Sequence, residues 1–160
     1  MHSHRRNGLA LLGVALALAS APCLASLGGA PSQFGNTSTN TSTRRAGVLA
    51  AGAPAAASAA YDINVTQLDN GTSVREYVAG GVVFAVAWNG PFLPNLRDLL
   101  GRHFATLTDA TARQPKGGHG PVRIAQPDVT IESTGHMRAY SGRAWVGSLL
   151  PAGFNIDAIQ

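Results

Sequence analysis

Hydrophobic and polar residues alternate along two stretches after residue 60, and a third stretch is apolar throughout. "YDINVTQL" (61–68) places Ile63 and Val65 on one face, and "TSVREYVA" (72–79) repeats the alternation. "VVFAVAW" (82–88) has apolar residues on both faces. Alternation is typical of a half-buried strand, and a short continuous apolar run is typical of a strand covered on both sides. The pattern predicts three strands, the third of them central.

The first two strands are joined by "DNGT", which contains a strong hairpin signal. Asn-Gly is favoured in two-residue hairpin loops because both residues tolerate a positive φ. With Asn70 and Gly71 as the loop, Val65 pairs with Glu76. This register places the Glu76 carboxylate on the apolar face, next to Val74.

The hydrophobic period changes between residues 90 and 107. Asn95 can cap a helix that begins at the next residue, and the charge of Asp98 suits the first turn. Apolar residues then recur at helical spacing, at Leu96, Leu99, Leu100, Phe104 and Leu107. The spacing predicts one amphipathic helix.

The remaining sequence returns to strand-like patterns after a loop rich in glycine and proline (115–120). "PVRIAQPDVTIES" (121–133) predicts two short strands broken at Pro127, and "HMRAYSGRAWV" (136–146) predicts one further strand, in which Gly142 allows a bulge or bend. Strands, one helix and then strands favour an α+β domain with a mostly antiparallel sheet and the helix packed on it. We predict this single domain over residues 61–160.

Residues 26–60 differ sharply in composition from the rest of the chain. They are mainly Ala, Ser, Thr, Gly, Pro and Asn, with Phe34 as the only aromatic residue. A stretch with so few large apolar groups buries too little surface to offset its loss of conformational entropy. The composition predicts a disordered, low-complexity linker.

The first 25 residues have the pattern of a signal peptide. A short basic region, "MHSHRR", precedes the apolar run 8–19, and Cys23 and Ala25 place small residues at the positions before a cleavage site. The run is shorter than the roughly 20 residues that span a bilayer. A lipid-modified Cys23 is the weaker alternative, because Pro22 does not fit the usual lipidation pattern. We expect export, to the periplasm or beyond the cell, with no stable membrane anchor after cleavage.

Cleavage after Ala25 changes the chemistry that the chain can offer. It removes Cys23, the only cysteine, and with it any thiol nucleophile, disulfide or Cys-based metal site. It also removes Arg5 and Arg6, which leaves ten basic against eight acidic residues, a formal charge of +2. Nucleic-acid binding needs a concentrated basic patch, so we expect no nucleic-acid partner.

Four motifs carry a resemblance to a known family: "VREYV" (74–78), "VFAVAWNGPFLPNLRDLLG" (83–101), "GHMRAYSGRA" (135–144) and "LLPAG" (149–153). In this order they resemble the domain of unknown function 2844 family, a group of small exported bacterial proteins, and the resemblance covers residues 61–157. The family has no assigned activity. The resemblance therefore implies export, and it implies no catalytic or binding residue.

The stretch from Gly135 to Ser141 offers one candidate binding site. If it is extended, His136, Arg138 and Tyr140 share one face, with Met137 on the other. Such a face could bind an anionic or sugar-like ligand. The alternative is the solvated face of an ordinary antiparallel sheet.

A buried histidine offers a candidate catalytic site. His103 falls on the apolar face of the predicted helix, where an imidazole must find a hydrogen-bond partner or lose its charge. Glu76 is a candidate partner, since it also points inward. A small exported hydrolase could combine His103, Glu76 and His136. The histidine spacing matches no metal-binding motif, and the sequence lacks the common nucleophile and phosphate-loop motifs, so we expect neither metal nor cofactor.

These observations favour binding over catalysis. Trp88 and Trp145 each end a predicted strand, where core positions are the usual fate of large aromatic residues. We expect an exported, non-catalytic binding or accessory module that engages a protein or a polysaccharide of the bacterial envelope. The small hydrolase remains the alternative, and it requires a pocket where its three residues converge.

Overall fold

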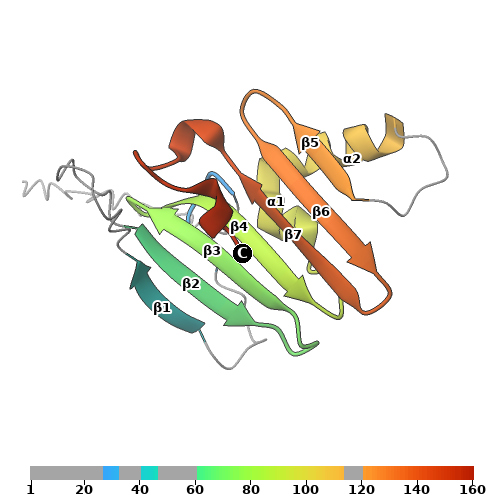
Figure 1. Cartoon of the computed structure of the whole chain (residues 1–160), viewed down its shortest axis with the longest axis horizontal. Coiled ribbons are helices and arrows are strands. Elements are labelled where there is room, and N and C mark those ends of the chain that lie inside the picture. Colours follow the sequence, from blue (N-terminus) through green and yellow to red (C-terminus); the bar gives the residue numbers. More distant parts are fainter. Residues whose placement is uncertain (1–26, 33–40, 47–60, 114–120) are drawn as a thin grey trace, which may run out of the picture.

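The computed structural model describes residues 27–32, 41–46, 61–113 and 121–160. Within them a single antiparallel sheet of seven strands has the order β1-β2-β3-β4-β7-β6-β5 (Figure 1). The strands are β1 (Thr41–Ala46), β2 (Tyr61–Gln67), β3 (Ser73–Ala79), β4 (Val82–Gly90), β5 (Val122–Ala125), β6 (Thr130–His136) and β7 (Ala139–Trp145).

One helical stretch follows β4 and lies on one side of the sheet. It consists of α1 (Leu96–Leu100), a 3-10 turn (Gly101–His103) and α2 (Phe104–Arg113). The Asn95 side chain accepts a hydrogen bond from the Arg97 amide and caps α1, as the sequence predicts. Gly101 has a φ of 53°, which only glycine adopts readily, and this breaks the regular α-helix. The α+β class, with an antiparallel sheet and a helix packed on it, is confirmed.

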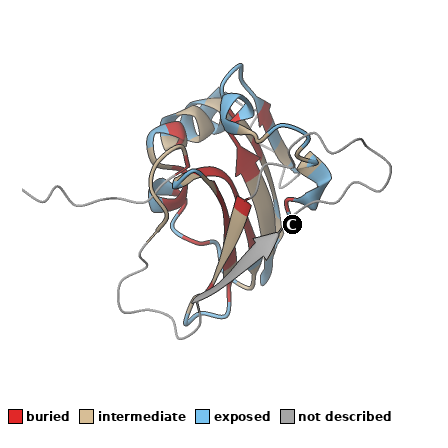
Figure 2. Cartoon of the chain, turned by 90° about the vertical axis from the view of Figure 1, so that its left-hand side faces the viewer, coloured by how far each residue is buried: buried red, intermediate tan, exposed pale blue. Residues whose placement is uncertain are grey.

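The helices and the sheet enclose the larger hydrophobic core. Leu99 and Leu100 of α1 are fully buried against alternate residues of β3, β4, β6 and β7. We call this side of the sheet the helix face, and Figure 2 shows its buried residues gathered between the layers. β4, the central strand, is buried on both sides, as its uninterrupted apolar sequence predicts.

The opposite side of the sheet, which we call the outer face, carries a second core. Tyr61, Tyr77 and Phe84 each pack edge-to-face with Phe154 from the segment after β7. A β-bulge between β3 and β4 helps to build this cluster. Tyr77 pairs with Ala85 and Val78 with Val83, so Phe84 is an extra residue on β4. Both Phe84 and Ala85 therefore belong to the second core, on the outer face.

The first hairpin differs from its predicted register by one residue. Leu68 N–H bonds to the Thr72 carbonyl, so the loop contains three residues and ends with Gly71 at φ 84°. This arrangement is the three-residue hairpin with a glycine in the left-handed region. Val65 consequently pairs with Arg75, not with Glu76. Glu76 still lies on the helix face and is buried, as predicted.

The predicted strand over residues 136–146 is wrong in one respect: it contains a hairpin turn. β6 ends at His136, β7 begins at Ala139, and Met137 and Arg138 form the two-residue connection. Arg138 has a φ of 66°, and the Met137 side chain is 93 % exposed. Neither turn residue is Gly, Asn or Asp, so the alternation alone predicts a continuous strand.

The prediction that residues 26–60 form only a linker is also wrong for two segments. Residues 27–32 lie between the helices and the sheet, where Leu27 is 1 % exposed and Gly28 and Gly29 exchange main-chain hydrogen bonds with Val83. β1 pairs with β2 along six residues. The rest of 26–60 lies outside the described residues. The folded unit therefore includes these two segments as well as residues from 61 onward.

The predicted signal peptide lies outside the described residues. Among those that the structure describes, no helix is long and apolar enough to cross a membrane.

Candidate functional site: a trough on the outer face

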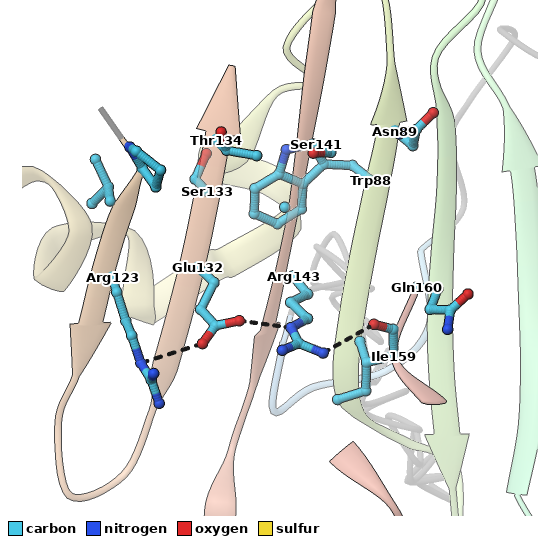
Figure 3. A pocket seen from close by; sticks show the side chains of 13 residues that line it. Trp88, Asn89, Arg123, Glu132, Ser133, Thr134, Ser141, Arg143, Ile159 and Gln160 are labelled. Carbon is cyan, nitrogen blue, oxygen red and sulfur yellow. Dashed lines mark hydrogen bonds and ion pairs between the residues drawn. The ribbon is translucent and has the colours of Figure 1, made fainter. Parts of the chain in front are cut away.

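A row of three charged residues crosses β5, β6 and β7 on the outer face. Arg123 pairs in register with Glu132, and Glu132 pairs with Arg143. Arg123 Nε lies 3.3 Å from Glu132 Oε1, and Arg143 Nε donates to Glu132 Oε2 at 2.7 Å (Figure 3). The carboxylate thus bridges two guanidinium groups, one through each oxygen.

The segment after β7 covers the neighbouring half of this face. It includes a 3-10 turn at Ile156–Ala158 and runs to Gln160. Its main-chain carbonyls accept hydrogen bonds from side chains of the sheet: Tyr77 Oη donates to the Ala158 carbonyl at 3.0 Å, and Arg75 to that of Gln160 at 2.8 Å. Arg143 reaches the Ile156 carbonyl at 3.3 Å. We call residues 151–160 the C-terminal segment.

Two open grooves lie between the C-terminal segment and β5, one on either side of the charged row. The first has a volume of about 590 Å³ and the second about 560 Å³. Both are lined by Arg123, Glu132 and Arg143. We call the two grooves together the trough. It follows the direction of β7 from Ser141 to Trp145, about 13 Å at the usual rise per residue of a strand.

The two ends of the trough differ in chemistry. The first groove has several neutral hydrogen-bonding side chains, and its walls are otherwise mostly carbon. The second groove carries aromatic rings from Trp145 and Phe154, together with Asp157. The neutral polar residues of the first groove are Asn89, Ser133, Thr134, Ser141 and Gln160.

Trp88 also lines the first groove. Its ring is 2 % exposed, and its buried Nε1–H has no hydrogen-bond partner among the described residues. The ring occupies the place that a side chain at Gly142 of β7 would take. Both tryptophans are core residues, as the sequence predicts.

The structure does not bring His136, Arg138 and Tyr140 onto one face. The turn at Arg138 separates the two strands, and Tyr140 pairs with Gly135 and Gly90 on the helix face. The Tyr140 ring lies over Gly135, where a Cβ atom would come within 2.5 Å of it. His136 is exposed at the end of β6. Neither groove of the trough is lined by these three residues.

His103 is buried on the helix face, and its sequence neighbour Arg102, rather than Glu76, is its hydrogen-bond partner. Its Nε2 accepts a hydrogen bond from Arg102 Nε at 3.2 Å. Burial lowers the pKa of His103, and the Arg102 charge lowers it further, while Asp128 acts in the opposite direction. His103 is therefore a neutral acceptor near pH 7.

Glu76 is buried on the same face and forms hydrogen bonds with Ser32 of residues 27–32. Its carboxylate accepts hydrogen bonds from the Ser32 amide and hydroxyl. Burial raises the pKa of Glu76, and the bonds from Ser32 offset part of this effect. Neither His103 nor Glu76 lines either groove of the trough. His136 does not line them either, and it lies at the turn between β6 and β7. The three candidate catalytic residues do not converge on these grooves.

The described residues also contain no group of three or more His, Cys, Asp or Glu side chains placed to hold a metal ion. Sequence reasoning missed Arg123 and Glu132 as site residues, and it named Arg143 only as part of a strand. The sequence shows that these residues are charged, but it does not show that they lie side by side, because their contact depends on how β5, β6 and β7 pair. Only the alternation of "VRIA" and "TIES" signalled that Arg123 and Glu132 point away from the core.

Comparison with known proteins adds family membership but no activity. No curated protein and no solved structure matched the chain. One family model matched residues 23–159, most of the chain, and that family is described only as a protein of unknown function. This range includes the buried segment 27–32 and β1. The chain therefore belongs to the DUF2844 family.

Proposed function

We propose that the chain is an exported, non-catalytic binding module of the bacterial envelope, and that the trough is its binding site. The single observation that carries this proposal is the charged row Arg123–Glu132–Arg143 between two open grooves. An ion pair with an exposed side chain contributes about 0–1 kcal/mol, so Arg123, which is 72 % exposed, adds little to stability through its pair with Glu132. Concave surfaces with a few convergent polar groups are typical of ligand sites.

The shape and the floor of the trough favour a polysaccharide over a small molecule or a peptide. The trough is open along its length, which suits a chain longer than one sugar unit. Its floor is the face of a sheet whose main-chain groups are already paired, so side chains alone recognise the ligand. An extended peptide binds most readily to a free strand edge, and here the edge strand β5 is short and bears the exposed Arg123.

Export is part of the proposal and rests on the sequence of residues 1–25. Cleavage after Ala25 would leave Ser26 as the first residue, directly before the buried Leu27. Intact-mass measurement on protein from the native host should show that residues 1–25 are absent. A mass that retains Met1, or that carries a lipid on Cys23, would contradict cleavage at this site.

The binding proposal is tested with polysaccharide fractions prepared from the host envelope. The purified chain should bind at least one fraction by isothermal titration calorimetry, and Arg123→Ala should abolish the signal or weaken it strongly. Arg113→Ala is the matched control, because Arg113 is an exposed arginine on α2, on the other side of the sheet. Binding that both variants retain in full, or that both lose equally, would rule out the trough as the site.

A further inference from the structure

We propose that the ligand of the trough is an acidic polysaccharide, and that a carboxylate of this ligand binds in the first groove. This inference rests on the proposed function and specifies its ligand. It follows from the charges that line each groove, from the way Glu132 positions the two arginines, and from the neutral donors around them.

The ionisable side chains that line the two grooves differ in formal charge. The ionisable side chains that line the first groove are Arg123, Arg143 and Glu132, which gives one positive charge in excess. The second groove adds Asp157 to the same three residues and is neutral. An anionic group on the ligand is therefore favoured in the first groove, and an uncharged part of the ligand in the second.

Glu132 holds the two guanidinium groups in place without using all of their donors. Its closest approach to Arg123 is through Nε, and Arg143 also donates to it through Nε. Nη1 of Arg143 already donates to the carbonyls of Ile156 and Ile159, but a guanidinium group has four further N–H donors on its terminal nitrogens. The Arg123 side chain is 72 % exposed, so these donors are accessible. Their fork geometry matches a carboxylate, which can accept two parallel hydrogen bonds.

The other polar groups of the first groove suit the hydroxyl groups of a sugar. Side chains of Asn89, Thr134 and Ser141 line it, and each can both donate and accept hydrogen bonds. The mostly carbon walls can contact the C–H faces of a sugar ring.

Three polymers separate an acidic polysaccharide from the other possibilities: polygalacturonate, uncharged dextran and poly-glutamate. Each is titrated into the purified full chain by calorimetry at low salt and again at high salt. We expect polygalacturonate to bind at least about tenfold more tightly than either of the others, because only this polymer offers both carboxylates and hydroxyls. High salt should weaken this binding, because exposed charges are screened.

Two substitutions give opposite expected effects. Arg123→Gln should weaken polygalacturonate binding about tenfold, the loss expected for one charge-assisted contact. Glu132→Gln should strengthen it several-fold at low salt, because the row changes from one to two excess positive charges while the amide oxygen of the glutamine can still accept from one of the two arginines. A purely structural role for Glu132 predicts weaker binding, not stronger. Arg113→Gln is the control and should have no effect.

The possible failures are distinguishable. Equal binding of dextran, lost in Arg123→Gln, would overturn the acidic ligand and leave the proposed polysaccharide module intact. Equal or tighter binding of poly-glutamate would show a general site for acidic polymers and overturn the sugar. No binding of polygalacturonate or dextran, while an envelope fraction still binds at the trough, would overturn only this inference. No binding of any polysaccharide would overturn both.

Discussion

Trp88 of β4 lies across Gly142 of β7, its paired residue on the neighbouring strand. A Cβ atom at Gly142 would come within 2.2 Å of Cζ2 of the indole and within 2.6 Å of the Glu132 carbonyl oxygen. Glycine at this position therefore allows the largest side chain of the core to pack flat against β7. The same contact connects the core to the strand that carries Arg143.

Gly142→Ala should consequently destabilise the protein. The added methyl group must displace the Trp88 ring or the β6 main chain, and overpacking of this kind typically costs about 1–3 kcal/mol. The free energy of unfolding is measured by urea titration followed by tryptophan fluorescence. Gly147→Ala is the control, since a Cβ atom there would have no neighbour within 4 Å. Equal stability of the two variants would contradict the packing of Trp88 over Gly142.

Leu27 should contribute strongly to stability, although it lies in a segment whose composition predicts a linker. It is buried among Leu99, Leu100 and the strands of the helix face, and its amide donates to the Leu99 carbonyl. Leu27→Ala should cost about 2–5 kcal/mol, as for other buried leucines. Leu93→Ala, at a residue that is 47 % exposed, should stay within about 0.5 kcal/mol of the parent. If Leu27→Ala is equally mild, residues 27–32 do not pack in solution.

The hairpin between β6 and β7 should tolerate changes that a continuous strand would not. Met137 is almost fully exposed, so Met137→Ala should change the free energy of unfolding by no more than about 0.5 kcal/mol. Arg138 has a left-handed backbone conformation, which costs a residue with a side chain about 1–2 kcal/mol. Arg138→Gly should therefore leave stability unchanged or raise it by up to about 1 kcal/mol, after the entropic cost of glycine. A clear loss in either variant, measured by thermal unfolding, would contradict the turn.

Periodicity in the sequence was sufficient to predict the strands of the central sheet and the capped helix. Their apolar residues repeat at every second position, or at every third and fourth, because each element has one buried side. The hairpin at Met137 and Arg138 was missed because its turn residues are atypical. Leu27 was missed because a single large apolar residue among glycines and serines gives no periodic signal. Its burial depends on the space between the helices and the sheet, which are distant from it in the sequence.

The trough was beyond prediction for a different reason. Arg123, Glu132 and Arg143 meet because β5, β6 and β7 pair in one particular register. A shift of one residue in either pairing would place a neighbour of Glu132 beside the arginines, and the sequence does not fix a register that accurately. Whether the three side chains are exposed together also depends on how much of the outer face the C-terminal segment covers.

Two buried ionisable groups on the helix face should give the protein opposing dependences on pH. Burial raises the pKa of Glu76 above its usual value of 4.5. The folded state then holds this proton more tightly than the unfolded state. The contribution of Glu76 to stability is fully present below pH 4.5 and is lost as the pH rises through the folded pKa. Burial and Arg102 lower the pKa of His103 from 6.5, so the unfolded state binds that proton more tightly.

The contribution of His103 is therefore fully present above pH 6.5 and is lost as the pH falls toward its lowered folded pKa. We expect Glu76→Gln to lose more stability than the parent between pH 7 and pH 4.5, because the opposing contribution of the carboxylate is removed. His103→Gln should instead lose less stability than the parent over the same interval, because the variant lacks the proton that the unfolded state binds more tightly. Urea titrations at half-unit steps of pH give both slopes, and each variant is compared with its own value at pH 7 so that any constant packing cost cancels. Parallel curves for the parent and His103→Gln would show that His103 keeps its ordinary pKa and is hydrated in the folded protein.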